Sequence, residues 1–231
     1  MKLDFLPKAI IFDVDETLVY YEDYNHREWF EKWVLPELKR RGMELDYKLY
    51  SKTARLELPR SYVKKLGIDP VEMWKVIDSV NLRFRRAMVL KGRVKRFQDV
   101  DAMEEIRILT PKLLTVTNAS EECSRFVLNL FDLEKYFDLI VGKDYSNIDG
   151  VKPNPYLIEK ALKAIGVSPR VALLVGDSIN DVKGGRRAGV RVVNLQRFGR
   201  VEGADFYART LWEIVEALED VAYGEATDSG L

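Results

Sequence analysis

Histidine and cysteine are scarce in this sequence of 231 residues, which contains one of each, His26 and Cys123. A single histidine excludes a zinc site built from several histidines, and any Ser-His-Asp triad would have to include His26. A single cysteine excludes intramolecular disulfides and cysteine-cluster metal sites, and it is typical of a reducing compartment. Because Asn129 is the sixth residue after Cys123, the Cys-x5-Arg loop of cysteine phosphatases is also absent.

Glycine-rich phosphate loops are absent as well. Only Gly142 is followed by a lysine, the next residue is Asp144, and no two glycines are separated by a single residue. This excludes the P-loop and the dinucleotide-binding motif. The first residues hold too short an apolar run for a signal peptide, and no run is long enough to span a membrane. We therefore expect a cytoplasmic protein.

The sequence has no excess of positive or negative charge, because 37 Lys or Arg balance 37 Asp or Glu. A formal net charge of zero argues against a broad basic face for nucleic acid. Hydrophobic residues make up 47% of the chain, enough for a core, and the length fits one large domain or one domain with an insertion. We expect a small-molecule substrate, no nucleic-acid or membrane partner, and a monomer or dimer.

Short apolar runs alternate with stretches of helical spacing. The runs, which predict buried parallel strands, are residues 9–12, 113–116, 137–141, 171–175 and 190–195. The helical stretches between the later runs are residues 121–130, 155–165 and 179–188. This alternation predicts an α/β fold with a doubly wound, Rossmann-like parallel sheet. Only the tail, residues 224–231, is expected to be disordered.

The interval between the first two strands differs, because residues 20–95 show helical rather than alternating spacing. We expect an inserted all-helical cap domain at residues 20–95, and an α/β core domain formed by residues 1–19 and 96–231. The predicted cap helices are residues 23–41 (bent at Pro36), 47–58, 60–66 and 70–90, with Trp29, Trp33 and Trp74 in their core. The cap holds 18 Lys or Arg against 11 Asp or Glu. This surplus would suit an anionic substrate, and surface ion-pair patterning explains it equally well.

Acidic and polar residues follow the predicted strands. At strand ends, or just beyond them, lie Asp13, Asp15, Thr117, Asn118, Lys152, Asp177 and Asp181. Each alone could be a helix cap, a turn former or a solvated charge, but the carboxyl ends of parallel strands share one crevice. Four carboxylates crowded there would raise each other's pKa unless a cation lay among them. Without thiolates or several imidazoles, a hard, oxygen-liganded ion such as Mg²⁺ fits that need.

The motifs D-V-D-E-T-L, T-N, V-K-P-N-P and G-D-S-I-N-D, in this order on strand ends, resemble those of the haloacid dehalogenase (HAD) superfamily. The resemblance spans residues 9–195. The helical insertion after the first motif resembles the cap of the subgroup that includes phosphoglycolate phosphatases and β-phosphoglucomutases. Many members have glycine where Glu16 stands, which puts the form of the turn before Thr17 in question.

The resemblance implies a role for each residue of this set. Asp13 would be the nucleophile that forms an aspartyl-phosphate, and Asp15 the acid and base for the leaving alcohol and the attacking water. The implied metal ligands are the Asp13 carboxylate, the Asp15 backbone carbonyl, the Asp177 carboxylate and Asp181, the last through water or by orienting Lys152. The implied phosphate-binding groups are Thr117, the N–H of Asn118 and Lys152, and Thr117 and Lys152 also count as catalytic. Thr17 would hold the turn that aims Asp15.

Asp15 also discriminates between reaction classes. A phosphoester needs a proton for its leaving alcohol, whereas carbon–halogen cleavage expels halide, so Asp15 favours a phosphatase over a dehalogenase. The expected function is a Mg²⁺-dependent phosphatase, a phosphoric monoester hydrolase, for a small phosphorylated metabolite. Two alternatives stay open: a phosphomutase of the same family, and a phospho-receiver or binding module.

Substrate choice is expected to come from cap residues that face the crevice. The candidates are Tyr20, Tyr21, Tyr24, His26, Arg83, Arg85 and Arg86. Of these we select Tyr24, Arg83 and Arg86 as the residues that contact substrate. The alternative for each is a packed tyrosine or a solvated arginine.

Overall fold

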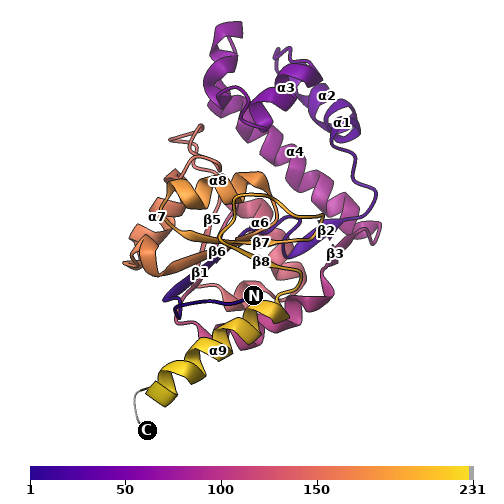
Figure 1. The fold of residues 1–231 in the computed structure, drawn as a ribbon. Coiled ribbons are helices and arrows are strands. Elements are labelled where there is room, and N and C mark those ends of the chain that lie inside the picture. The colour runs from indigo at the N-terminus through magenta and orange to yellow at the C-terminus, as the bar shows by residue number, and fades with distance from the viewer. Residues whose placement is uncertain (229–231) are drawn as a thin grey trace.

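A six-stranded sheet lies at the centre of the computed structural model, which describes residues 1–228, and the side chains of residues 1–224 (Figure 1). Its strands are β1 (Ala9–Phe12), β4 (Leu113–Val116), β5 (Leu139–Val141), β6 (Ala172–Gly176), β7 (Arg191–Leu195) and β8 (Phe206–Ala208). They lie in the order β5-β4-β1-β6-β7-β8, and every neighbouring pair is parallel. The predicted α/β fold class, with its doubly wound sheet, is confirmed.

Apolar side chains bury both faces of this sheet. In β1, Ile10 and Phe12 belong to one buried cluster, whereas Ala9 and Ile11 belong to another. All four are fully buried because helices cover both faces, which is why the strand reads as a continuous apolar run. The helices of this part are α5 (Met103–Leu109), α6 (Glu121–Leu130), α7 (Tyr156–Ile165), α8 (Ile179–Arg187) and α9 (Trp212–Asp228), with 3-10 turns η3 (Gln98–Ala102), η4 (Glu134–Tyr136) and η5 (Pro169–Val171).

The five predicted strands are confirmed, with ends shifted by no more than two residues. β8 and α9 were not predicted. Because α9 extends to Asp228, the expectation of a disordered tail is wrong for residues 224–228, and residues 229–231 lie outside the described part of the chain. Among the described helices, none is long and apolar enough to cross a membrane.

Between β2 (Val19–Tyr21) and β3 (Val94–Arg96) the chain forms a helical insertion, residues 22–93. Its elements are α1 (His26–Trp29), the π-helix η1 (Phe30–Val34), α2 (Leu35–Arg40), α3 (Tyr47–Ala54), the 3-10 helix η2 (Arg60–Leu66) and α4 (Pro70–Leu90). They enclose a third buried cluster that includes Trp29 and Trp74, with Trp33 packed against it. Figure 1 shows the insertion above the sheet, with the long helix α4 running back to β3.

Three details of this insertion differ from the sequence predictions. β2 and β3 form an antiparallel pair inside residues 20–95, which were expected to be all helical, because strands of three residues are too short to show alternation. The predicted helix 23–41 is interrupted by the π-helix η1 instead of only bending at Pro36. The predicted helix 47–58 ends at Ala54, and Leu56 takes a left-handed φ of 59°. The division into core and cap domains stays a prediction.

Candidate active site

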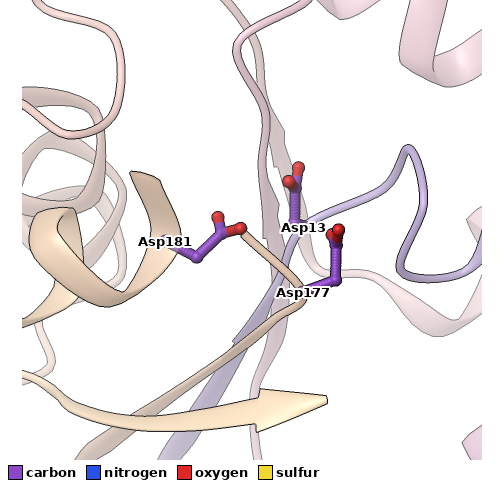
Figure 2. A group of neighbouring side chains, drawn as sticks. All are labelled: Asp13, Asp177 and Asp181. Carbon is purple, nitrogen blue, oxygen red and sulfur yellow. The ribbon is translucent and has the colours of Figure 1, made fainter. Parts of the chain in front are cut away.

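Three carboxylates gather at the carboxyl ends of β1 and β6. Asp13 follows β1, Asp177 follows β6, and Asp181 lies on α8 (Figure 2). Parallel register sets Phe12 beside Val175, so the residues after these two strands meet at one edge of the sheet. One carboxylate oxygen from each of the three acids lies within 4.8 Å of the others. The arrangement has the oxygen-only donor set that suits Mg²⁺.

A glycine and a helix cap bring Asp181 into this group. A Cβ atom on Gly176 would lie 2.4 Å from the Asp181 Cγ, so no side chain fits at the end of β6. The backbone N–H of Ser178 donates to Asp181 Oδ2 at 3.0 Å, and the Ser178 hydroxyl donates to the same oxygen, in a capping box that begins α8. Asp181 is therefore fully buried and fixed in orientation.

The acids repel one another. Burial, followed by the charge of Asp181, raises the pKa of Asp13 well above its usual range, and the cation of Lys152 opposes this rise. Burial and Asp181 likewise raise the pKa of Asp177 to about 6, although the Thr17 hydroxyl, which donates to Asp177 Oδ1 at 2.8 Å, opposes the rise. The Thr17 hydroxyl thus binds Asp177, and the role of Thr17 in holding the turn that aims Asp15 stays a prediction.

Lys152 supplies the positive charge inside this group. It is 1% exposed, and its Nζ lies 3.0 Å from Asp13 Oδ1 and 2.5 Å from Asp181 Oδ1. Burial alone would lower the pKa of Lys152, but the two carboxylates outweigh it and raise that pKa. One cation among three carboxylates leaves a negative site, which a divalent cation would balance.

Asn118, which follows β4 together with Thr117, supports the Lys152 segment. The Asn118 side chain donates to the Lys152 carbonyl at 2.7 Å and accepts from the Lys152 N–H at 2.8 Å. The Thr117 Oγ1 accepts from the Ala119 N–H at 3.1 Å, which leaves the Thr117 hydroxyl hydrogen able to donate elsewhere. The structure therefore brings Thr117, Asn118 and Lys152 to the same edge of the sheet as Asp13.

Asp15 faces the helical insertion. Arg85 Nη2 donates to Asp15 Oδ2 at 2.6 Å, and the Tyr21 hydroxyl donates to Asp15 Oδ1 at 3.2 Å. The carboxylate of Asp15 is not part of the close group formed by the other three acids. Of the four residues expected to bind metal, the structure thus gathers three carboxylates, and Asp15 could add only its backbone carbonyl.

Glu16 occupies the position where related sequences often have glycine. Its φ of 63° is left-handed, a conformation that glycine adopts freely and that strains other residues. Burial, together with the charges of Asp15 and Asp177, raises the pKa of Glu16 to about 7. The turn before Thr17 is therefore one that glycine would suit, with a carboxylate added at its tip.

A cavity of about 230 Å³ lies between this edge of the sheet and the helical insertion. From the core side it is lined by Asp15, Glu16, Asn118, Ala119 and Lys143. From β2 and the insertion it is lined by Tyr21, Tyr24, His26, Trp29, Tyr50, Ala54, Arg60, Trp74, Ile77, Asp78, Asn81, Phe84 and Arg85. Asp13, Thr117 and Lys152 are not among its lining residues, so the cavity lies next to the group of acids and does not enclose it.

The structure changes the choice of cap residues. Tyr24 lines the cavity as predicted, but Arg83 and Arg86 do not: Arg83 donates to Glu37 on the surface, and Arg86 lies over the ring of Phe126. Of these three arginines of α4, Arg85 lines the cavity, and it is 4% exposed. Successive residues of a helix are rotated by about 100°, so Arg83, Arg85 and Arg86 point in different directions and only Arg85 faces the crevice.

Arg85 was among the sequence candidates, whereas three other charged residues of the cavity were not: Arg60, Asp78 and Lys143. The spacing of three or four residues from Trp74 through Asp78, Asn81 and Arg85 marks one face of α4 and could have indicated Asp78. No comparable signal exists for Arg60, because it lies in a 3-10 helix, or for Lys143, because it follows β5 in a loop.

Known proteins resemble this chain in sequence and in fold. It is 41% identical over 80 residues to the pyrophosphatase PpaX of Halalkalibacterium halodurans, over 35% of this chain and 36% of that protein. It is 42% identical over 80 residues to the phosphoglycolate phosphatase of Aquifex aeolicus, over 35% of this chain and 37% of that protein. The matched segments thus span little more than a third of these relatives.

In structure, the chain superposes on CbbY from Rhodobacter sphaeroides, solved in complex with phosphate, with a TM-score of 0.66 and 19% identity. That similarity covers 92% of this chain and 99% of CbbY, and it shows a common fold. The model of the haloacid dehalogenase-like hydrolase family matches residues 10–195, which include every acid described above. The chain belongs to the haloacid dehalogenase-like hydrolase family.

Proposed function

We propose that this chain is a Mg²⁺-dependent phosphatase that hydrolyses a small phosphorylated metabolite through an aspartyl-phosphate on Asp13. The observation that carries the proposal is the gathering of Asp13, Asp177, Asp181 and Lys152 at the ends of β1 and β6, beside a cavity roofed by the helical insertion. Membership of a hydrolase family supports it, as do two relatives whose names describe phosphatase and pyrophosphatase activity.

The donor set fits a divalent cation of the hard type. Asp13 and Asp177 would hold Mg²⁺ through carboxylate oxygens, with the backbone carbonyl of Asp15 and, through water, Asp181 as further ligands. The raised pKa values of Asp13 and Asp177 support this assignment, because a cation would stabilise both ionised forms. When bound, the metal ion neutralises negative charge on the phosphoryl oxygens.

Asp13 has one oxygen available for attack. Its Oδ1 accepts from the Val14 N–H at 2.8 Å and lies 3.0 Å from Lys152 Nζ, so Oδ2 is left for phosphorus. In the first step Oδ2 forms a bond to phosphorus while the bond from phosphorus to the leaving oxygen breaks. Lys152 favours the ionised form of Asp13, the form that acts as a nucleophile, and so opposes part of the effect of burial.

Asp15 moves the protons of both steps. In the first step it gives a proton to the leaving alcohol, and in the second it takes one from the water that attacks the phosphorus of the aspartyl-phosphate. The second step breaks the bond between phosphorus and Asp13 Oδ2, releases inorganic phosphate and restores both carboxyl groups. Asp15 suits this role because it lines the cavity and lies two residues from Asp13.

Polar groups at the sheet edge would hold the phosphoryl oxygens. The Thr117 hydroxyl, the backbone N–H of Asn118 and Lys152 are the donors, and none needs to reorganise because each is fixed by the contacts described above. The helical insertion would act as the cap that excludes water and carries the substrate-selecting residues. In this proposal the enzyme works in the cytoplasm as a monomer or dimer.

A phosphate-release assay on a panel of phosphorylated metabolites, with and without Mg²⁺, tests the proposal. Asp13→Asn should abolish release while leaving the folded structure intact, and the exposed Asp132→Asn is the matched control that should keep full activity. Phosphate release by Asp13→Asn at the wild-type rate would remove the nucleophile. Isomerised sugar phosphate in place of free phosphate would show a phosphomutase, and a long-lived aspartyl-phosphate without release would show a receiver module.

A further inference from the structure

Arg60 is a buried cation that lines the cavity and forms no ion pair with the described residues. Its side chain is 3% exposed and stacks on the ring of Trp74, with the guanidinium carbon 4.1 Å from the ring centre. The Nε and Nη1 groups are both buried and have no hydrogen-bond partner among the described residues. Buried donors are almost always paired in folded proteins, so an unpaired guanidinium that lines a cavity indicates a ligand.

The other two cations of the cavity are already neutralised. Arg85 pairs with Asp15 at 2.6 Å, and Lys143 pairs with Asp78 at 2.7 Å. Arg60 forms no ion pair within the part of the chain that the structure describes. Burial therefore lowers the pKa of Arg60 to about 10, an effect that the nearby charge of Asp78 opposes only in part. An anion in the cavity would relieve this cost.

Further unpaired donors surround the same space. The Nε1 groups of Trp29 and Trp74 and the Nε group of Arg85 are buried without a hydrogen-bond partner, and all three residues line the cavity. Donors thus accumulate in this cavity on elements of the helical insertion. An acceptor with several oxygens, such as a carboxylate or a phosphate, is the chemical group that such a set binds.

From this we infer that the cavity holds a second anionic group of the substrate against Arg60, so that the substrates are short phosphorylated compounds carrying a carboxylate or a second phosphate. The inference rests on the proposed function, in which the reacting phosphoryl group occupies the edge of the sheet. The cavity volume of about 230 Å³ lies below the roughly 300–1,000 Å³ of pockets for drug-sized ligands, which limits the part of the substrate beyond the phosphoryl group to a small one.

The test compares three substrates by their kcat/KM for phosphate release in the presence of Mg²⁺. Phosphoglycolate carries a carboxylate, ethylene glycol bisphosphate carries a second phosphate, and phosphoglycolamide is the neutral counterpart of the first. We expect one of the two charged substrates to be preferred over the amide. The preferred substrate shows whether the second anionic group is a carboxylate or a phosphate. Arg60→Gln should lower kcat/KM for the preferred substrate about 10- to 100-fold, and change the value for the amide less than about 3-fold.

Two control variants accompany this comparison. Arg83→Gln removes a positive charge from α4 outside the cavity, and should leave all three values within about 2-fold of the wild type. Arg60→Lys keeps the charge and should retain part of the preference for the charged substrate. If Arg60→Gln fails to fold, Arg60→Lys provides the test, because the loss of the two-pronged guanidinium should still reduce the preference.

The outcomes separate this inference from the proposed function. Equal losses for the charged and neutral substrates in Arg60→Gln, or an unmodified enzyme that accepts the amide as well as the charged substrates, would overturn the inference. In either case phosphate is still released, so the proposed function stands. An unmodified enzyme that releases no phosphate from these substrates or from p-nitrophenyl phosphate would overturn both.

Discussion

Asp15 and Arg85, which are 70 residues apart in sequence, form an ion pair of 2.6 Å across the boundary between the sheet and the helical insertion. Arg85 is buried, and its Nη1 also donates to the Cys123 carbonyl at 3.2 Å. The insertion therefore contacts a residue of the first motif directly. In the proposed mechanism this contact sets where the proton-transferring carboxylate lies relative to the substrate.

The first prediction concerns the strength of this pair. A double-mutant cycle of Asp15→Asn and Arg85→Gln should show a coupling of about 1–3 kcal/mol in the free energy of unfolding, because Arg85 is almost fully desolvated. Denaturant unfolding of the four proteins measures it. The matched cycle on Glu37 and Arg83, whose arginine side chain is 53% exposed, should give a coupling below about 0.5 kcal/mol. Additive effects at Asp15 and Arg85 would contradict the prediction.

The second prediction concerns Lys152. The pKa of Lys152 is raised in the folded protein, so the stabilisation that Lys152 provides is fully present below about pH 10, near the pKa of an unfolded lysine. This stabilisation is lost only as the pH rises through the higher pKa of the folded protein. At pH 7 Lys152→Met should therefore lower the free energy of unfolding by about 3–5 kcal/mol, because it leaves Asp13 and Asp181 buried without a cation. It should also abolish phosphate release, because Lys152 is one of the proposed donors to the phosphoryl oxygens.

Chemical denaturation at pH 7 measures this loss. The control is Lys160→Met, which removes a half-exposed lysine paired with Asp144 and should cost less than about 1 kcal/mol. A Lys152→Met protein as stable as the wild type would show that the buried carboxylates need no cation, and that their mutual repulsion is smaller than the structure indicates.

The third prediction concerns Asp177 and the metal ion. Because its folded pKa is raised to about 6, Asp177 stays protonated in the folded protein over a pH range in which the unfolded chain has lost that proton. The stability of the metal-free protein should therefore fall as the pH rises from about 4 to 6 and stay low at pH 7. Asp177→Asn should remove this loss and raise the free energy of unfolding at pH 7 by about 1–2 kcal/mol, since the amide oxygen can still accept from Thr17.

Scanning calorimetry in the presence of EDTA or of Mg²⁺ compares the metal-free and metal-bound proteins. Mg²⁺ should raise the Tm of the wild type and leave that of Asp177→Asn almost unchanged, because the variant lacks one carboxylate ligand. A metal-free Asp177→Asn protein that is less stable than the wild type at pH 7, or that gains the same Tm from Mg²⁺, would contradict the assignment.

The fourth prediction concerns Glu16. Glu16→Gly places a glycine where the backbone φ is left-handed, which relieves the strain of a residue with a side chain. It also removes a partly buried carboxylate whose pKa is raised to about 7. It should stabilise the protein by about 0.5–1 kcal/mol at pH 8, where Glu16 is ionised, and by less at pH 5. Glu16→Ala is the matched variant: it removes the charge but keeps the strain, so it should gain less. Equal unfolding free energies for the two variants would contradict the role of strain.

The sequence alone determined the sheet and the acids at its edge. Continuous apolar runs are required where helices cover both faces of a strand, so β1, β4, β5, β6 and β7 could be predicted within two residues. Because parallel strands present their carboxyl ends together, the residues that follow them had to meet, and Asp13 and Asp177 do so. These features follow from local periodicity and from strand direction, both of which can be seen in the order of the residues.

The tertiary structure decided which partner each of these residues has. The pairing of Asp15 with Arg85 depends on how α4 lies against the first motif. Lys143 pairs with Asp78, whereas Arg60 forms no ion pair with the described residues. Residues far apart in sequence make these contacts, and their geometry depends on the rotation of a helix about its axis and on the packing of the insertion against the sheet. Residue order specifies neither quantity directly, so the gathering of acids at the sheet edge was predictable while the lining of the cavity beside it was not.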